Sequence, residues 1–154
     1  MTQKGIDMFR KYKLMIPLAS VFCALGILSG NSIQLASVAE AQSSARVFEL
    51  RTYTTFPGRL DALHMRFADH TIGLFERHGM TNIGYFSPQD SPLAENTLIY
   101  ILAHESRAAA QASWAAFVDD PEWQRVYEES QRDGRVVDKL ESVFLDATDY
   151  SQLK

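Results

Sequence analysis

The sequence predicts an α+β fold, in which one four-stranded antiparallel sheet carries helices on one of its faces. A strand-like alternation of side chains over residues 47–54 gives way to a helical spacing of apolar residues over 59–78. Two more strand-like segments, a second helical region and a last strand then follow in turn. The resulting order, βαββαβ, is that of a ferredoxin-like split βαβ unit.

The first predicted strand carries different side chains on its two faces. Residues 47–54 are β-branched, aromatic and alternating, which favours a pleated, half-buried strand. Phe48 and Leu50 share one face and suit packing under a helix. The opposite face carries an acid, a base and a phenol, namely Glu49, Arg51 and Tyr53. Pro57-Gly58 cannot continue a strand ladder, so the strand is predicted to end before this pair.

A single amphipathic helix is predicted over residues 59–78. Its apolar side chains recur at helical spacing along one stripe, while the charged residues fall elsewhere. The stripe consists of Leu60, Leu63, Phe67, Thr71, Leu74 and Phe75. Gly79 is a natural residue to follow the helix C-terminus, so the helix is expected to end at His78.

The second half of the domain continues with strands and helices. Strands are predicted over about residues 82–86 and 97–104, separated by a polar loop. Ser106 is a good N-cap for an Ala-rich helix that reaches about Val118. Asp119 and Glu122 have capping-box spacing around Pro121, so another helix is predicted to start there. A last strand is predicted over about residues 140–148.

One face of the predicted sheet has no helix to cover it. The residues expected on that face are largely apolar: Val47, Tyr53, Tyr100 and Leu102. A second copy of the chain is the simplest cover, and closed two-fold symmetry is the commonest arrangement of identical subunits. The sequence therefore predicts a homodimer whose two sheets enclose an α/β barrel, with Glu49 and Arg51 facing inward.

The first 41 residues have the pattern of a secretory signal peptide. A basic start, Lys4 to Lys13, precedes an apolar run from Leu14 to Gly30, and Ala39-Glu40-Ala41 offers a small-x-small cleavage site. An uncleaved membrane anchor is the alternative, although a run of seventeen residues is at the lower limit for a span. The predicted organisation is a signal peptide at 1–41 and one folded domain at 42–154, exported to the periplasm or secreted.

The expected mature chain is acidic. The leader contains four of the 15 basic residues and two of the 19 acidic ones, which leaves a net charge of −6 with histidine neutral. An acidic domain is a poor candidate for binding nucleic acid, and no membrane association is expected after cleavage. Cys23 is the only cysteine and belongs to the leader, so disulfides and thiol chemistry are not expected in the mature domain.

Five side chains are predicted to converge on one pocket: Glu49, Arg51, Tyr53, Tyr100 and His104. Residues two apart on a strand share a face, and neighbouring strands share that face if their register permits. Buried charges are costly unless they are paired, so Glu49 and Arg51 have two interpretations. They either recognise a small polar or aromatic ligand, or they form a charge network that fixes the register of the dimer.

The histidines do not have the spacing of metal ligands. His64, His70 and His78 are never three or four residues apart, and no cysteine supplements them in the mature domain. No metal site and no cofactor are therefore predicted, and no motif is specific enough to name a reaction.

Three motifs in register resemble the NIPSNAP family. They are Val47–Thr54 followed by Pro57-Gly58-Arg59-Leu60, then Gly84-Tyr85-Phe86, and finally Asp120-Pro121-Glu122-Trp123-Gln124. Together they cover almost all of the expected mature chain. The sequence departs from the family on the third strand, where Tyr100-x-Leu102-x-His104 replaces an expected His-x-Trp-x-Tyr pattern. Its ligand or chemistry is therefore expected to differ from that of other members.

The resemblance implies a dimeric α/β-barrel fold but no mechanism, because the family has no established catalytic residues. We expect a homodimeric binding or scaffold module with an internal barrel cavity. The alternative is a small-molecule enzyme of the barrel type, since the wider superfamily includes cofactor-independent monooxygenases and haem-degrading enzymes.

Overall fold

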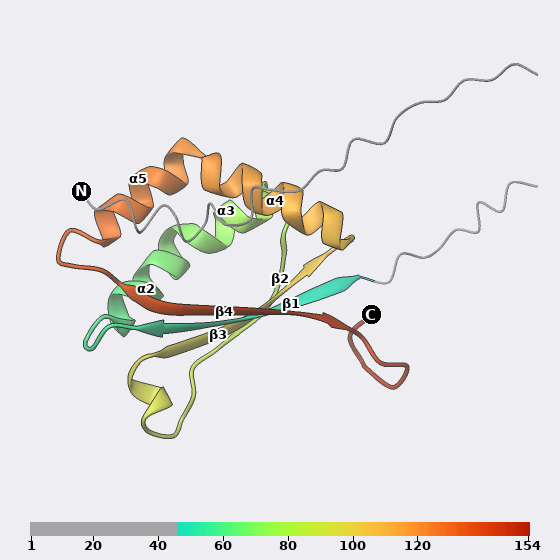
Figure 1. The fold of residues 1–154 in the computed structure, drawn as a ribbon, viewed down its shortest axis with the longest axis horizontal. Helices are drawn as coiled ribbons and strands as arrows, with labels where there is room; N and C mark the ends of the chain where they lie inside the picture. The colour runs from blue at the N-terminus through green and yellow to red at the C-terminus, as the bar shows by residue number, and fades with distance from the viewer. Residues whose placement is uncertain (1–45) are drawn as a thin grey trace, which may run out of the picture. The chain divides into compact units, whose positions relative to one another are not determined.

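The computed structural model describes residues 46–154 and confirms the predicted α+β fold (Figure 1). A single four-stranded sheet carries helices on one face, and the order of its elements is βαββαβ when neighbouring helices are grouped. The predicted signal peptide, and the domain boundary after Ala41, lie outside the described residues.

All four strands are antiparallel to their neighbours in the sheet. They are β1 (Val47–Thr55), β2 (Thr81–Phe86), β3 (Thr97–His104) and β4 (Val137–Asp146), arranged in the order β2-β3-β1-β4. The last strand begins earlier than predicted, because its pairing with β1 continues past an irregularity to Val137, opposite Thr55. Strand β1 has a paired neighbour on each side, so its side chains are surrounded by those of β3 and β4.

A π-helical turn divides the helix predicted over residues 59–78. The helices α2 (Leu60–Arg66) and α3 (Ile72–Arg77) flank the π-helical segment η1 (Phe67–Thr71). The hydroxyl of Thr71 donates a hydrogen bond of 3.0 Å to the carbonyl oxygen of Arg66, which links the two ends of the wider turn. Such π-helical turns are rare and occur frequently at functional sites.

Two helices follow β3. The first begins at its predicted cap, Ser106, whereas the second is capped by Asp120 and not by Asp119, which the capping-box spacing suggested. The helix α4 (Arg107–Asp119) starts after Ser106, whose hydroxyl accepts a hydrogen bond from the backbone N–H of Ala109. The helix α5 (Pro121–Ser130) starts with proline at its first position, and the carboxylate of Asp120 accepts from the N–H of Glu122. These bonds satisfy N–H groups that have no partner within a helix. A short 3-10 turn, η2 (Leu93–Glu95), lies in the loop between β2 and β3.

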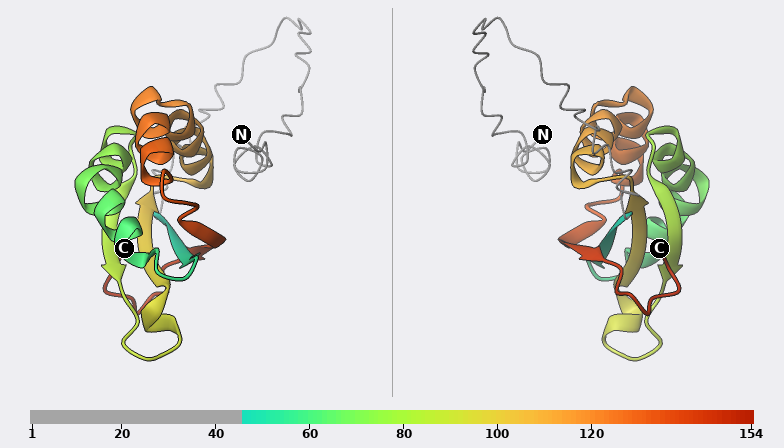
Figure 2. Two further views of the ribbon diagram at one scale, coloured as in Figure 1. Left: turned by 90° about the vertical axis from the view of Figure 1, so that its left-hand side faces the viewer. Right: turned by 90° about the vertical axis from the view of Figure 1, so that its right-hand side faces the viewer.

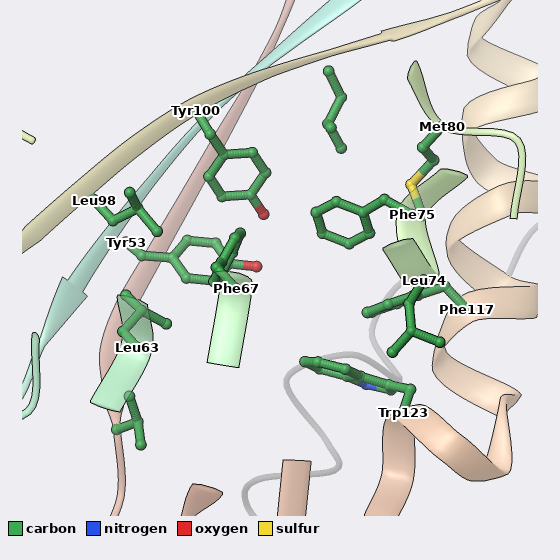
Figure 3. Packing of buried hydrophobic residues seen from close by; sticks show 12 residues of the cluster. Tyr53, Leu63, Phe67, Leu74, Phe75, Met80, Leu98, Tyr100, Phe117 and Trp123 are labelled. Atoms are coloured by element: carbon green, nitrogen blue, oxygen red, sulfur yellow. The ribbon is translucent and has the colours of Figure 1, made fainter. Parts of the chain in front are cut away.

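The hydrophobic core fills the space between the sheet and the helices. In both views of Figure 2 the helices lie on the same side of the strands. Figure 3 shows Tyr53 and Tyr100 pointing from the sheet toward Phe67 and Phe75. The rings of Tyr100 and Phe67 meet edge to face with their centroids 5.2 Å apart, and Phe75 lies 5.0 Å from Phe117. The core is therefore held largely by aromatic packing.

The orientation predicted for the first strand was wrong. Tyr53 and Tyr100 belong to the core under the helices, and so does Leu102, which pairs with Glu49. Because directly paired residues project from the same face, Glu49, Arg51 and Tyr53 all point toward the helices. The opposite set, expected under the helices, projects from the face that has none: Phe48, Leu50 and Thr52 on β1, with Ala103, Ile101 and Ile99 opposite them on β3.

The helix-free face of the sheet carries large apolar side chains that are exposed to solvent in the single chain. Val143 and Leu145 on β4 pair with Leu50 and Phe48, and their side chains are 54% and 38% exposed. Phe86 on β2 pairs with Ile99 and is 53% exposed. This face therefore presents apolar side chains from all four strands, and the exposed Lys139–Glu141 ion pair lies beside them on β4.

Within residues 46–154, no helix has both the length and the apolar character needed to cross a membrane.

Candidate functional site

The carboxylate of Glu49 is the centre of a buried network between the sheet and α4. Its Oε1 accepts hydrogen bonds from Arg51 Nη1 at 2.7 Å and from Ser142 Oγ at 2.6 Å. Its Oε2 accepts from Trp114 Nε1 at 2.7 Å and from His104 Nε2 at 3.0 Å. Two strands beside β1 and one helix thus converge on a single side chain.

Four hydrogen-bond donors stabilise the ionised form of the Glu49 carboxylate. Burial would raise its pKa, but the hydrogen bond from His104, the charge of Arg51 and the hydrogen bonds from Ser142 and Trp114 together lower it to about 2. Each oxygen already has two donors, so little accepting capacity remains. Glu49 is therefore unsuited to act as a general base at neutral pH and is suited to hold its neighbours in place.

Arg51 is held between the carboxylate and aromatic rings. Its guanidinium carbon lies 4.0 Å from the centroid of the Trp114 ring, and its Nη2 donates to the Tyr53 hydroxyl at 3.3 Å. Burial lowers the pKa of Arg51, but Tyr100, Tyr53 and Glu49 raise it overall above its ordinary value. The guanidinium therefore stays charged, and stacking on the indole adds a cation–π contribution.

Glu49 also fixes the orientation of His104. An ionised carboxylate only accepts hydrogen bonds, so the Nε2 atom of His104 carries a proton when it bonds Glu49 Oε2. Its Nδ1 is buried and has no hydrogen-bond partner among the described residues. A carboxylate that orients one ring nitrogen and leaves the other open is an arrangement used for acid–base chemistry, provided that a substrate can reach the ring.

The Tyr100 hydroxyl is the innermost polar group of this cluster. It is fully buried, and burial raises its pKa well above the ordinary value, against the opposing effect of Arg51. It makes no hydrogen bond of ordinary geometry within residues 46–154. Tyr53 packs against it edge to face, with ring centroids 5.3 Å apart. The Tyr100 phenol is therefore neutral at neutral pH and is closely packed against Tyr53.

The structure brings the five predicted residues together, but not on the predicted side of the sheet. Glu49, Arg51, Tyr53, Tyr100 and His104 all lie under the helices and are buried, rather than facing the interior of a barrel between two sheets. Their role in binding a ligand remains a prediction.

Two members of the network were missed by sequence analysis. Neither Trp114 nor Ser142 was among the predicted site residues. Ser142 is paired with Arg51 on the neighbouring strand, so the register of β4 would have placed it beside Glu49. The sequence does not indicate a role for Trp114 in the network, because a tryptophan on a helix is usually a packing residue. Its indole N–H reaches Glu49 only because the tertiary fold places α4 over β1.

The side chains in the described part of the chain lack the ligand arrangement of a metal site. No cluster of three or more histidine, cysteine, aspartate or glutamate side chains within residues 46–154 has the arrangement of a metal site. At the end of α3, the ring Nε2 of His78 bonds the carboxylate of Asp120 at 2.7 Å.

Comparison with protein families identifies the domain. The family model described as NIPSNAP matches residues 48–152, which is well over half of the chain. The chain belongs to the NIPSNAP family. The resemblance seen in the three sequence motifs is thereby confirmed.

Solved NIPSNAP structures share the fold. A family protein of unknown function from Agrobacterium tumefaciens has 23% identity and a TM-score of 0.63, over 72% of this chain and 96% of that one. A second family protein from the same organism has 20% identity and a TM-score of 0.62, over 71% and 99%. An uncharacterised NIPSNAP-like domain protein from Burkholderia xenovorans has 19% identity and a TM-score of 0.61, over 70% and 90%. At these identities the likeness shows the fold alone. A search of curated proteins found no match.

The Asp120-Pro121-Glu122-Trp123-Gln124 motif joins α3 to α5 in this structure. Asp120 accepts hydrogen bonds from His78 and from Arg77, and the bond from His78 is the largest cause of a pKa well below the usual range. Glu122 pairs with Arg77 at 2.8 Å. Trp123 packs 4.4 Å from the ring of Phe117 at the turn between α4 and α5. The motif therefore has a structural explanation, which is to hold the start of α5 on the core.

Proposed function

We propose that this NIPSNAP domain is an exported homodimeric binding or scaffold module. The helix-free face of the sheet supports the homodimer, because Phe86, Val143 and Leu145 are exposed there beside further apolar residues of β1 and β3. Contiguous apolar surface of this kind marks an interaction site. A second copy offers an identical face, and two such sheets packed together would form an α/β barrel.

A charge introduced on that face is expected to break the homodimer. Val143→Asp would bury a carboxylate without a partner between the two sheets, so the dissociation constant of the dimer should rise at least about tenfold. Light scattering and sedimentation over a range of concentrations measure this. Met65→Asp is the matched control, since Met65 is 60% exposed on α2 in the helical layer and should leave the dimer intact. A wild-type protein that stays monomeric at micromolar concentration contradicts the proposal.

The buried network supports a structural role better than a catalytic one. Glu49 is saturated with donors and has a pKa of about 2, so it orients Arg51, His104 and Trp114 and does not exchange protons at neutral pH. The charge pair lies between sheet and α4 within one chain, and not between two chains. Its role is therefore to fix how α4 sits on the sheet, in place of the dimer register that the sequence suggested.

An enzymatic function is the second candidate, because within residues 46–154 one ring nitrogen of His104 is free to act on a substrate. The buried Nδ1 atom of His104 has no hydrogen-bond partner in the described part of the chain, and Glu49 orients the ring from its other side. Thermal-shift measurements with haem and a panel of small aromatic compounds separate the two candidates. Turnover of a bound compound that is lost in His104→Ala would establish the enzyme, and the absence of turnover supports the binding module.

Export is proposed from the leader pattern in residues 1–41. We expect the amino terminus of the exported protein to be Gln42 or a residue close to it, and N-terminal sequencing measures this directly. A membrane-bound product that retains Lys4 to Lys13 would show instead that the leader is an anchor.

A further inference from the structure

A second polar site lies between α2 and α5. The two helices pack against each other, and a cavity of about 340 Å³ opens between them and η1. Arg59 and Arg66 line it together with Ser130 and three acidic residues, Asp69, Glu129 and Asp133. We call this cavity the α2–α5 groove. It lies within one chain and involves no residue of the Glu49 network.

Arg66 is a buried cation without a carboxylate partner. Its side chain is only 4% exposed, yet no aspartate or glutamate within residues 46–154 is close enough to form an ion pair with it. Nη1 donates to Ser130 Oγ at 3.2 Å, and Nε is buried without a hydrogen-bond partner. Its guanidinium lies over Trp123 and Tyr127, 5.5 and 5.7 Å from their ring centroids. Burial without a countercharge is costly and lowers the pKa of Arg66.

Arg59 adds a second guanidinium to the same groove. Its Nη2 donates to the carbonyl oxygens of Ser130 and Gly134, at 3.0 and 3.1 Å, which holds it at the end of α5. Its Nε is also buried and lacks a hydrogen-bond partner in the described part of the chain. Two guanidinium groups that line the same cavity, each with an N–H that has no hydrogen-bond partner in residues 46–154, are suited to bind a carboxylate.

The rim of the groove has the opposite charge. Asp69, from the π-helical segment η1, and Asp133, after α5, are exposed and form no ion pair among the described residues. Glu129 is already paired with Arg125 at 2.7 Å. A ligand with several negative charges would be repelled by this rim, whereas a ligand with an ammonium group at its other end would be attracted.

We propose that the α2–α5 groove binds a small zwitterion, with its carboxylate at Arg59 and Arg66 and its ammonium group at Asp69 and Asp133. The cavity volume is within the usual range for small-molecule sites. The π-helical turn after Arg66 is consistent with this function, because it places Asp69 on the rim directly beyond the buried arginine. The site goes beyond the proposed homodimer and does not depend on it.

Titration of the purified protein with three probes tests the site: 4-aminobutyrate, acetate and butylammonium. We expect 4-aminobutyrate to saturate amide chemical-shift changes confined to residues 59–70 and 126–134, and to bind at least about tenfold more tightly than either single-charge probe. No saturation by 4-aminobutyrate, or equal binding of acetate, would overturn the proposal. Light scattering of the same samples reports the dimer separately, so failure of one proposal is distinguished from failure of the other.

Two variants assign the binding to the groove. Arg66→Gln should weaken 4-aminobutyrate at least about tenfold. Because Arg66 is buried and this variant can fail to fold, Asp133→Asn on the exposed rim is the second test. It should weaken 4-aminobutyrate severalfold and leave acetate binding unchanged. Asp138→Asn, at an exposed residue of β4 outside the groove, is the matched control and should change neither. Unchanged binding of 4-aminobutyrate to Asp133→Asn would contradict the assignment.

Discussion

Glu49→Ala is expected to lower the free energy of unfolding by about 3–5 kcal/mol, because it removes one member of a buried ion pair and leaves the other without a countercharge. Arg51 would remain in place under α4, and the side chains of His104, Trp114 and Ser142 would lose the acceptor that they share. Urea unfolding at a fixed protein concentration measures the difference, since dissociation of a homodimer would otherwise contribute to it.

A carboxylate in the exposed part of the helical layer is the control for this substitution. Asp61, in the first turn of α2, is exposed and lies away from the helix-free face. An exposed charge near a helix N-terminus contributes little, so Asp61→Ala should change the free energy of unfolding by less than about 1 kcal/mol. An effect of Glu49→Ala as small as that of Asp61→Ala would show that the network does not stabilise the fold.

Acid is expected to remove about 3 kcal/mol of stability through Glu49 alone. The pKa of this carboxyl is about 2 in the folded chain and 4.5 ordinarily, so the folded state favours its ionised form. The resulting stabilisation is complete above about pH 4.5 and is lost as the pH falls through about 2. Urea unfolding at a series of pH values measures the slope in this window.

Glu49→Gln isolates this contribution, because glutamine does not titrate. Asp120 also has a lowered pKa, through its hydrogen bonds with His78 and Arg77, and it remains in both proteins. The difference in slope between wild type and variant below pH 4.5 therefore reports Glu49. Parallel slopes would show that the carboxyl titrates with an ordinary pKa.

The local pattern of the sequence determined most of the secondary structure. Alternation over residues 47–54 defines β1, and Ser106 begins α4 as the predicted cap. The start of α5 was predicted, but its cap is Asp120 and not Asp119, which the capping-box spacing suggested. The π-helical turn at η1 was not predictable, because Leu63, Phe67, Leu74 and Phe75 fit a regular helix as well. The turn depends on how this segment packs against the core, which local spacing does not encode.

The sequence by itself also determined which candidate residues of each strand share a face. Period-two alternation groups Glu49, Arg51 and Tyr53, and it groups Tyr100 with His104. That the two groups lie on one face follows from the register of β1 and β3, in which Arg51 pairs with Tyr100. Alternation does not say which face the helices cover, because both faces of β1 carry large apolar side chains. Only the tertiary structure decided this. Trp114 and Ser142 lie 65 and 93 residues from Glu49, and they supply donors that make its burial under α4 favourable. With Glu49 and Arg51 on the helix side, the apolar side chains of Phe48 and Leu50 project from the helix-free face.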